Sequence, residues 1–167
     1  HDEDTLIGPL ALPNQRDDDW PRFFRDRRLM HFARLCLDAD RIDTGLMARI
    51  ERLADNITRY LPADVTPSLL HGDVWTGNLL WQGGRLAAFI DPAVTAGDRE
   101  VEFTFATVWS TFDADFFAAY EEILPFRPGF HEERRHLYNL YPLLVHTRLF
   151  GGGYGQVVSQ TLSRFGY

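Results

Sequence analysis

Hydrophobic residues recur at spacings of three and four in the first third of the chain, as is typical of amphipathic helices. A first helix is expected over residues 18–37, with Asp18 or Asp19 as its cap and Pro21 in its first turn. The preceding residues, 5–17, show no sustained periodicity and contain glycine and prolines. We expect them to form an extended connector.

The same spacing returns at several later places in the chain. A second helix is expected from about Thr44 until Pro62 ends it. Further helices are expected over residues 99–110, 113–124, 131–150 and 155–165, and Pro142 is expected to kink the third of these four.

Short apolar runs replace the helical pattern between Pro67 and Asp91. They predict strands over residues 68–71, 78–81 and 85–91, the last two joined as a hairpin through Gln82-Gly83-Gly84. No internal repeat or charge block marks a second domain. The sequence therefore predicts one domain over residues 1–167, of the α+β class and mostly helical.

Composition excludes several functions. All 17 basic residues are arginine, so no Walker A loop, Schiff-base lysine or phosphate-holding kinase lysine can come from this chain. The formal charge of -7 argues against a nucleic-acid partner. Because no apolar run approaches about 18 residues, we expect neither a membrane span nor a signal peptide, and the protein is expected to be cytoplasmic.

Some reactive side chains have simpler structural interpretations. Cys36, the only cysteine, lies among apolar residues and is expected to be buried rather than nucleophilic. His131 and His136 are five residues apart, which separates them around a helix and disfavours a metal site. The pair Arg134 and Arg135 is expected on a solvated face.

The candidate catalytic and metal-binding residues lie in the run from His71 to Asn78 and, after a hairpin, at Asp91. A hydroxyl that attacks the terminal phosphate of ATP needs a carboxylate to accept its proton, and the phosphates need Mg²⁺ held by oxygen ligands. Asp73 and Asn78 would lie at the two ends of a glycine-containing turn, and Asp91 would return to face them. Such residues are singly common in turns. Their ordered combination favours Asp73 as base and Asn78 and Asp91 as metal ligands.

Two neighbours complete the candidate site. His71 is placed with the catalytic residues, more as a group that orients the loop by hydrogen bonding than as one that transfers a proton. Trp75 is a candidate for substrate binding by stacking on a sugar or its amine-bearing part. Core packing is an equal alternative for this tryptophan.

His71–Asn78 and Ile90-Asp91-Pro92 resemble the catalytic and metal loops of aminoglycoside phosphotransferases, choline kinases and fructosamine kinases. Further segments resemble the fructosamine (ketosamine) kinases in particular, and the resemblance covers nearly the whole chain. These segments are Phe23–Leu29, Asp91–Ala93, Arg99-Glu100, Glu132–Arg135, Leu140–His146 and Phe150–Tyr154.

The resemblance implies phosphorylation of a sugar hydroxyl on a ketoamine, with ATP and Mg²⁺ as cofactors. It implies that the chain is the C-terminal lobe of a protein-kinase-like fold, whose small β-hairpin carries the catalytic and metal loops. An N-terminal lobe with a phosphate-covering loop and a lysine is expected to be missing here, and the isolated chain is expected to be inactive. The glycines of 151–155 do not match that loop, because Gln156 stands at its last glycine position, and are expected to separate two helices.

One position departs from the family pattern. Glu102 stands where relatives commonly carry aspartate, and its extra methylene is expected to displace any tie to the catalytic loop. Three alternatives stay open: an aminoglycoside-type or other small-molecule kinase, a metal-dependent hydrolase using His71, Asp73 and Asp91, and a non-catalytic binding module left by truncation.

Overall fold

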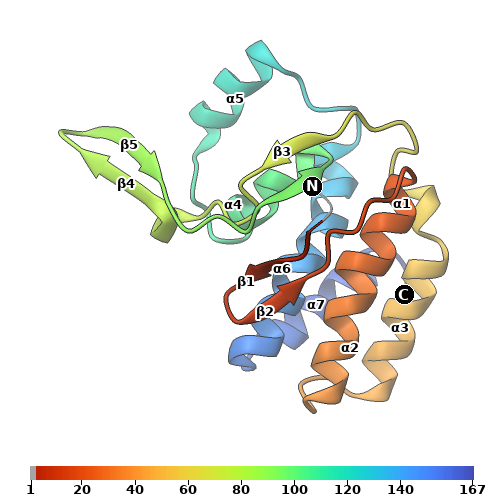
Figure 1. Cartoon of the computed structure of the whole chain (residues 1–167). Coiled ribbons are helices and arrows are strands. Elements are labelled where there is room, and N and C mark those ends of the chain that lie inside the picture. Colours follow the sequence, from red (N-terminus) through yellow and green to blue (C-terminus); the bar gives the residue numbers. More distant parts are fainter. Residues whose placement is uncertain (1–2) are drawn as a thin grey trace.

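The hydrophobic core lies among helices that pack side by side in a computed structural model, which describes residues 3–167 (Figure 1). Four helices form most of this core: α2 (His31–Asp38), α3 (Thr44–Asp55), α6 (Arg135–Phe150) and α7 (Tyr154–Arg164). Three two-stranded antiparallel sheets are found among the described residues. The fold thus mixes helices with small sheets, as expected, and helices predominate.

The first expected helix is present. It runs through α1 (Trp20–Phe23), the π-helical segment η1 (Phe24–Met30) and α2. Asp19 caps it by accepting a hydrogen bond of 2.9 Å from the N–H of Arg22. The apolar side of this helix packs on α6.

The expectation of an extended connector over residues 5–17 is wrong in part. Strands β1 (Thr5–Ile7) and β2 (Leu10–Leu12) form an antiparallel hairpin, turning at Gly8, which has a φ of +54°. Ile7 and Leu12 are buried in the core. Strands of three residues are too short to show an alternating pattern in the sequence.

The second helix begins at Thr44, as expected, but ends earlier than expected. Asp43 caps α3 through a 2.7 Å hydrogen bond from the N–H of Leu46. The helix ends at Asp55 and is followed by a short 3₁₀ turn, η2 (Ile57–Arg59).

The predicted hairpin is confirmed. Strands β4 (Leu79–Gln82) and β5 (Arg85–Phe89) pair through a turn at Gly83 and Gly84 and project as an arm from the body (Figure 1). The first predicted strand, β3 (Ser68–Leu70), pairs with β6 (Thr95–Gly97), a strand that the sequence analysis did not predict.

The predicted C-terminal helices are present with modified boundaries. The helix expected over residues 99–110 is a 3₁₀ turn followed by a short α-helix, and the glycines after Phe150 separate α6 from α7 as expected. α6 runs through Pro142. The elements before α6 are η4 (Arg99–Glu102), α4 (Phe103–Val108), α5 (Ala114–Ile123) and the π-helical η5 (Phe130–Arg134). No helix in residues 3–167 is long and apolar enough to span a bilayer.

Burial confirms one side-chain expectation and overturns another. Cys36 is buried, and the loss of solvent raises the pKa of its thiol to about 12. Arg134 does not lie on a solvated face: it is buried and donates two hydrogen bonds, of 2.7 and 3.1 Å, to the carboxylate of Glu100. A buried guanidinium needs such a partner, and the partner lies 34 residues earlier in the chain.

Candidate active site

The candidate catalytic loop connects β3 to β4 and ends in the 3₁₀ turn η3 (Thr76–Asn78). The side-chain amide nitrogen of Asn78 donates to the backbone carbonyl of Asp73 at 2.8 Å and to its carboxylate at 3.0 Å. The structure therefore brings these two predicted site residues together. Because the side-chain amide nitrogen of Asn78 is used within the loop, its side-chain carbonyl oxygen is the atom suited to a metal.

Asp91 follows β5, at the end of the β4–β5 hairpin where Asn78 precedes β4. The backbone N–H of its neighbour Ile90 donates to the backbone carbonyl of Asn78 at 3.0 Å. Asp91 is solvent-exposed, with a φ of +53°, a left-handed conformation that aspartate and asparagine tolerate better than most residues. Asp91 therefore comes directly after the residue that pairs with Asn78. A carboxylate and an amide oxygen are a donor set that Mg²⁺ accepts when phosphates and water complete its shell.

Burial raises the pKa of the Asp73 carboxyl, and the nearby negative charge of Asp91 adds to this effect. The hydrogen bond from Asn78 and the proximity of His71 act in the opposite direction. A carboxylate with a raised pKa is a better proton acceptor than an ordinary one. These surroundings suit the predicted base.

His71 is placed to orient the loop. Its Nδ1 accepts the N–H of Asp73 at 3.3 Å, so the proton belongs on Nε2, which donates to the carbonyl of Ile90 at 3.0 Å. The imidazole therefore links the catalytic loop to the segment that carries Asp91. Its catalytic assignment stays a prediction.

Glu102 corrects an expectation. Its carboxylate accepts the N–H of His71 at 2.7 Å and the N–H of Gly72 at 2.9 Å, so the longer side chain does not displace the tie to the loop. Gly72 has a φ of +82°, and a Cβ there would lie 2.1 Å from the carbonyl oxygen of Ala93. Only glycine fits at this point of the loop.

Trp75 lies outside the hydrophobic core and is 40% exposed. Its ring covers Gly77, where an added Cβ would come within 2.4 Å of the ring carbons. The core-packing alternative is therefore wrong. A role in stacking against substrate stays a prediction.

Sequence reasoning missed the anchor behind Glu102. Asp98, which caps the 3₁₀ turn η4, and Glu100, within that turn, are fully buried and pair with Arg127 and Arg134 respectively. The signal was present as acidic residues between Thr95 and Phe103 and arginines beyond residue 126, but nothing in the spacing joins the two groups.

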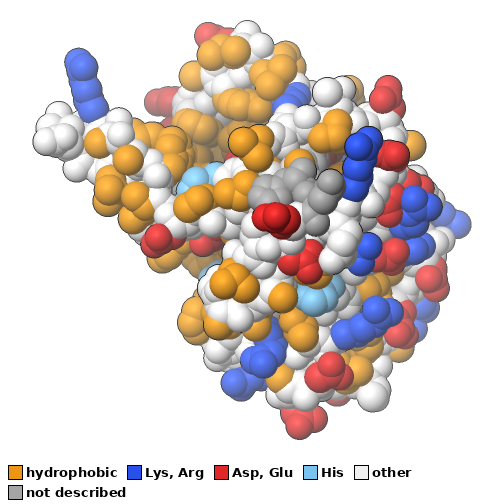
Figure 2. Space-filling model, in the orientation of Figure 1, with side chains coloured by type: hydrophobic (Ala, Val, Ile, Leu, Met, Phe, Trp, Pro, Cys, Tyr) orange, Lys and Arg blue, Asp and Glu red, His pale blue; other side chains and the backbone are white. Residues whose placement is uncertain are grey.

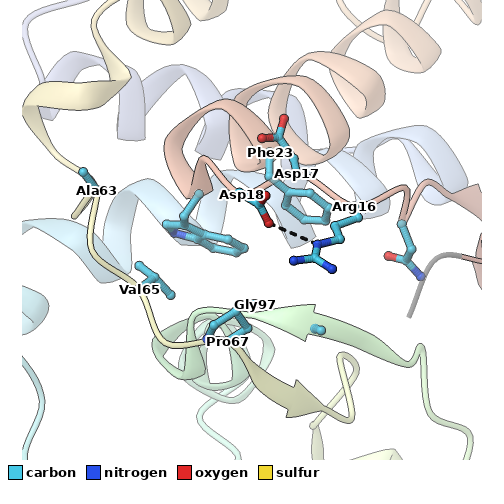
Figure 3. Close-up of a pocket in the computed structure, with 11 residues that line it drawn as sticks. Arg16, Asp17, Asp18, Phe23, Ala63, Val65, Pro67 and Gly97 are labelled. Carbon is cyan, nitrogen blue, oxygen red and sulfur yellow. Dashed lines mark hydrogen bonds and ion pairs between the residues drawn. The ribbon is translucent and has the colours of Figure 1, made fainter.

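Two hollows in the described structure lie away from this loop. A pocket of about 480 Å³ opens between the start of α1, residues 63–67 and β6, with Trp20 and Phe23 as its aromatic lining (Figure 3). Arg16 and Asp18 form a 3.1 Å ion pair beside it (Figure 3). None of the predicted site residues lines this pocket. Within residues 3–167 there is also no cluster of three or more histidine, cysteine, aspartate or glutamate side chains suited to a metal.

Comparison with known proteins assigns the family. Residues 1–165 match the family model described as fructosamine kinase. The Probable ketoamine kinase of Enterococcus faecium is 33% identical over 164 residues, which cover 98% of this chain and 59% of that protein. The chloroplastic protein-ribulosamine 3-kinase of Oryza sativa is 36% identical over 154 residues, covering 90% of this chain and 44% of that protein.

A solved structure agrees. The crystal structure of a fructosamine-3-kinase candidate from Thermobifida fusca superposes with a TM-score of 0.89 at 32% identity, covering 96% of this chain and 55% of that one. The chain belongs to the fructosamine kinase family. It spans about half the length of the relatives that it matches.

Proposed function

We propose that this chain is the catalytic and substrate-binding lobe of an ATP-dependent kinase that phosphorylates a sugar hydroxyl of ketoamines, an activity suited to the repair of glycated amines. The observation that supports the proposal is the hydrogen bond between Asn78 and Asp73, together with the backbone pairing of Asn78 with Ile90, the residue just before Asp91. Family membership and the ketoamine kinases among the relatives support the substrate class.

Each residue has a separate task in this proposal. Asp73 accepts a hydrogen bond from the sugar hydroxyl and takes its proton as the hydroxyl oxygen bonds to the terminal phosphorus of ATP, while the bond from that phosphorus to the ADP oxygen breaks and ADP leaves. Asn78 and Asp91 would hold Mg²⁺, which neutralises phosphate charge when bound with ATP. Trp75 offers an exposed ring face on which a sugar can stack. His71 and Glu102 keep the loop in place.

The proposal requires a second lobe that grips ATP, because this chain supplies no lysine. The exposed apolar side chains of the β4–β5 arm are suited to contact with such a lobe (Figure 2). Its four large members are 39–61% exposed: Leu80, Trp81, Leu86 and Phe89. The 167-residue chain alone is accordingly proposed to lack kinase turnover.

Phosphate transfer to defined acceptors tests the proposal. The intact protein would be incubated with ATP and Mg²⁺ and, in parallel, with fructosyl-lysine, ribulosyl-lysine or an aminoglycoside, and products would be followed by ³¹P NMR. A new sugar phosphate from either ketoamine supports the proposal. Phosphorylation of the aminoglycoside alone would assign the chain to the antibiotic-kinase alternative, and no transfer to any acceptor would contradict kinase function.

A further inference from the structure

A shallow groove of about 680 Å³ lies where the α2–α3 connection, α3 and the start of α7 meet. Arg41, Arg49 and Arg52 line it, and Asp43 is its single acidic lining residue. Three positive charges less one negative charge leave the groove formally at +2, in a chain whose formal charge is -7. Such a local reversal of sign concentrates anions.

The charges of the two outer arginines are available to a ligand. Within residues 3–167, no ion pair to a carboxylate side chain involves Arg41 or Arg52. Arg49 is held in place, since it donates to the hydroxyls of Ser159 and Ser163 and to the backbone oxygen of Tyr167. Arg49 therefore shapes the groove, while Arg41 and Arg52 are the groups that can fold over a bound anion.

Backbone close to Arg41 adds to the positive potential. A Cβ on Gly151 would lie 3.0 Å from a guanidinium nitrogen of Arg41, so this side chain lies directly against the glycine turn before α7. α7 is 11 residues long, and its N-cap, Gly153, has no side chain to satisfy the first N–H groups. Gly152 and Gly155 line the groove at this helix end. The guanidinium and the helix terminus thus face the same space.

We propose that this groove binds a phosphate group, either free phosphate or the phosphomonoester of a small metabolite. Guanidinium forks and backbone N–H groups match the several oxygens of a phosphate dianion better than the two of a single carboxylate. A nucleic acid is disfavoured because the acidic chain would repel an extended polyanion.

The groove is distinct from the candidate active site. None of its lining residues comes from the catalytic loop, the β4–β5 hairpin or η4. The α2–α3 connection and the β4–β5 arm also lie at opposite ends of the molecule in Figure 1. The phosphate site therefore does not depend on the proposed kinase activity.

Titration of the intact protein with inorganic phosphate at constant ionic strength tests the proposal. Binding would be followed by ¹H–¹⁵N NMR of the backbone amides of Gly152, Gly153 and Gly155 and by calorimetry, with chloride as the reference anion. We expect saturable shifts of these amides. The double variant Arg41→Gln/Arg52→Gln should bind roughly tenfold more weakly, since two exposed charge-assisted contacts are lost.

A matched control and a competition experiment complete the test. Arg34→Gln removes an exposed arginine of α2 outside the groove and should leave phosphate binding unchanged. Tighter binding of glucose 6-phosphate than of phosphate would indicate a metabolite, and equal binding would indicate free phosphate. Shifts that do not saturate, equal losses in the control and the double variant, or displacement of phosphate by an acidic peptide at lower concentration would each overturn the proposal.

Discussion

The carboxylate of Glu102 and the backbone N–H of Gly72 are joined by a hydrogen bond of 2.9 Å, beside a second bond of 2.7 Å from the N–H of His71. Both donors belong to the start of the loop that carries Asp73. The loop is therefore fixed by a side chain from η4, which is itself held by buried ion pairs.

Glu102→Gln should destabilise the fold by about 1 kcal/mol, because an amide nitrogen would face one of the two backbone donors and leave it unsatisfied. Burial raises the pKa of Glu102, so removing its charge also relieves a desolvation cost and keeps the loss at the low end of the usual range. Urea unfolding measures the change. Glu132→Gln, an exposed control, should have little effect, and equal unfolding midpoints for both variants would contradict the prediction.

Gly72→Ala should cost about 3 kcal/mol or more, because it combines a left-handed backbone with a clash against the Ala93 carbonyl. Gly83→Ala is the matched control: its φ is +58°, but no atom lies within 4 Å of the added Cβ. Only backbone strain of about 1 kcal/mol is expected there. Thermal unfolding of the two variants separates the clash from the strain, and similar losses would argue against the loop geometry described here.

Asp73→Asn in the intact protein should lower kcat by about 10²- to 10⁴-fold, with a much smaller change in KM for the ketoamine. The asparagine can still accept the hydrogen bond from Asn78, so the loop should keep its shape while the proton acceptor is lost. Steady-state kinetics measure the effect. A kcat within a few-fold of the parent would show that another group is the base.

The same substitution should increase stability at neutral pH. Because the folded state raises the pKa of Asp73 above its usual 3.8, the folded protein holds this proton more tightly than the unfolded chain does. Stability from this group is greatest at low pH and falls as pH rises through the folded pKa. The difference between Asp73→Asn and the parent should therefore grow from about pH 4 upward and then level off. Unfolding midpoints that differ equally at all pH values would contradict this.

Asp91→Asn should raise the Mg²⁺ concentration needed for half-maximal kinase rate, because a neutral amide oxygen is a weaker ligand than a carboxylate. Asparagine tolerates the φ of +53° at this position, so folding should be preserved. Rates measured across a Mg²⁺ series, with Asp115→Asn on α5 as an exposed control, test the assignment. An unchanged Mg²⁺ dependence would remove Asp91 as a ligand.

Local pattern predicted the longer elements well. The helix through residues 20–38 and the β4–β5 hairpin carry their own signals, a capping aspartate in one and a glycine pair in the other. β1, β2 and β6 have three residues each and are defined by partners elsewhere in the chain, so no local pattern revealed them.

In the candidate site, too, features set by local sequence were predicted and features set by distant contacts were not. Asp73, Asn78 and Asp91 were predicted because the loop and the hairpin place them by short-range geometry. Arg134 was wrongly expected on the surface, because its burial depends on pairing with Glu100. The hydrogen bond between Glu102 and the catalytic loop was not expected, because the length of a side chain does not tell where its backbone lies relative to the loop. These contacts are set by packing between distant segments.

The core that joins both ends of the chain has a consequence for biosynthesis. Ile7 and Leu12 of the first hairpin share one buried cluster with Val158 and Leu162 of the last helix. During translation the first hairpin leaves the ribosome long before α7 is synthesised. The apolar side chains that pack against α7 in the folded protein therefore stay exposed in the growing chain. This cluster is therefore completed only after α7 has been made, and a nascent chain stalled before α7 should be a strong client for chaperones that bind exposed hydrophobic segments.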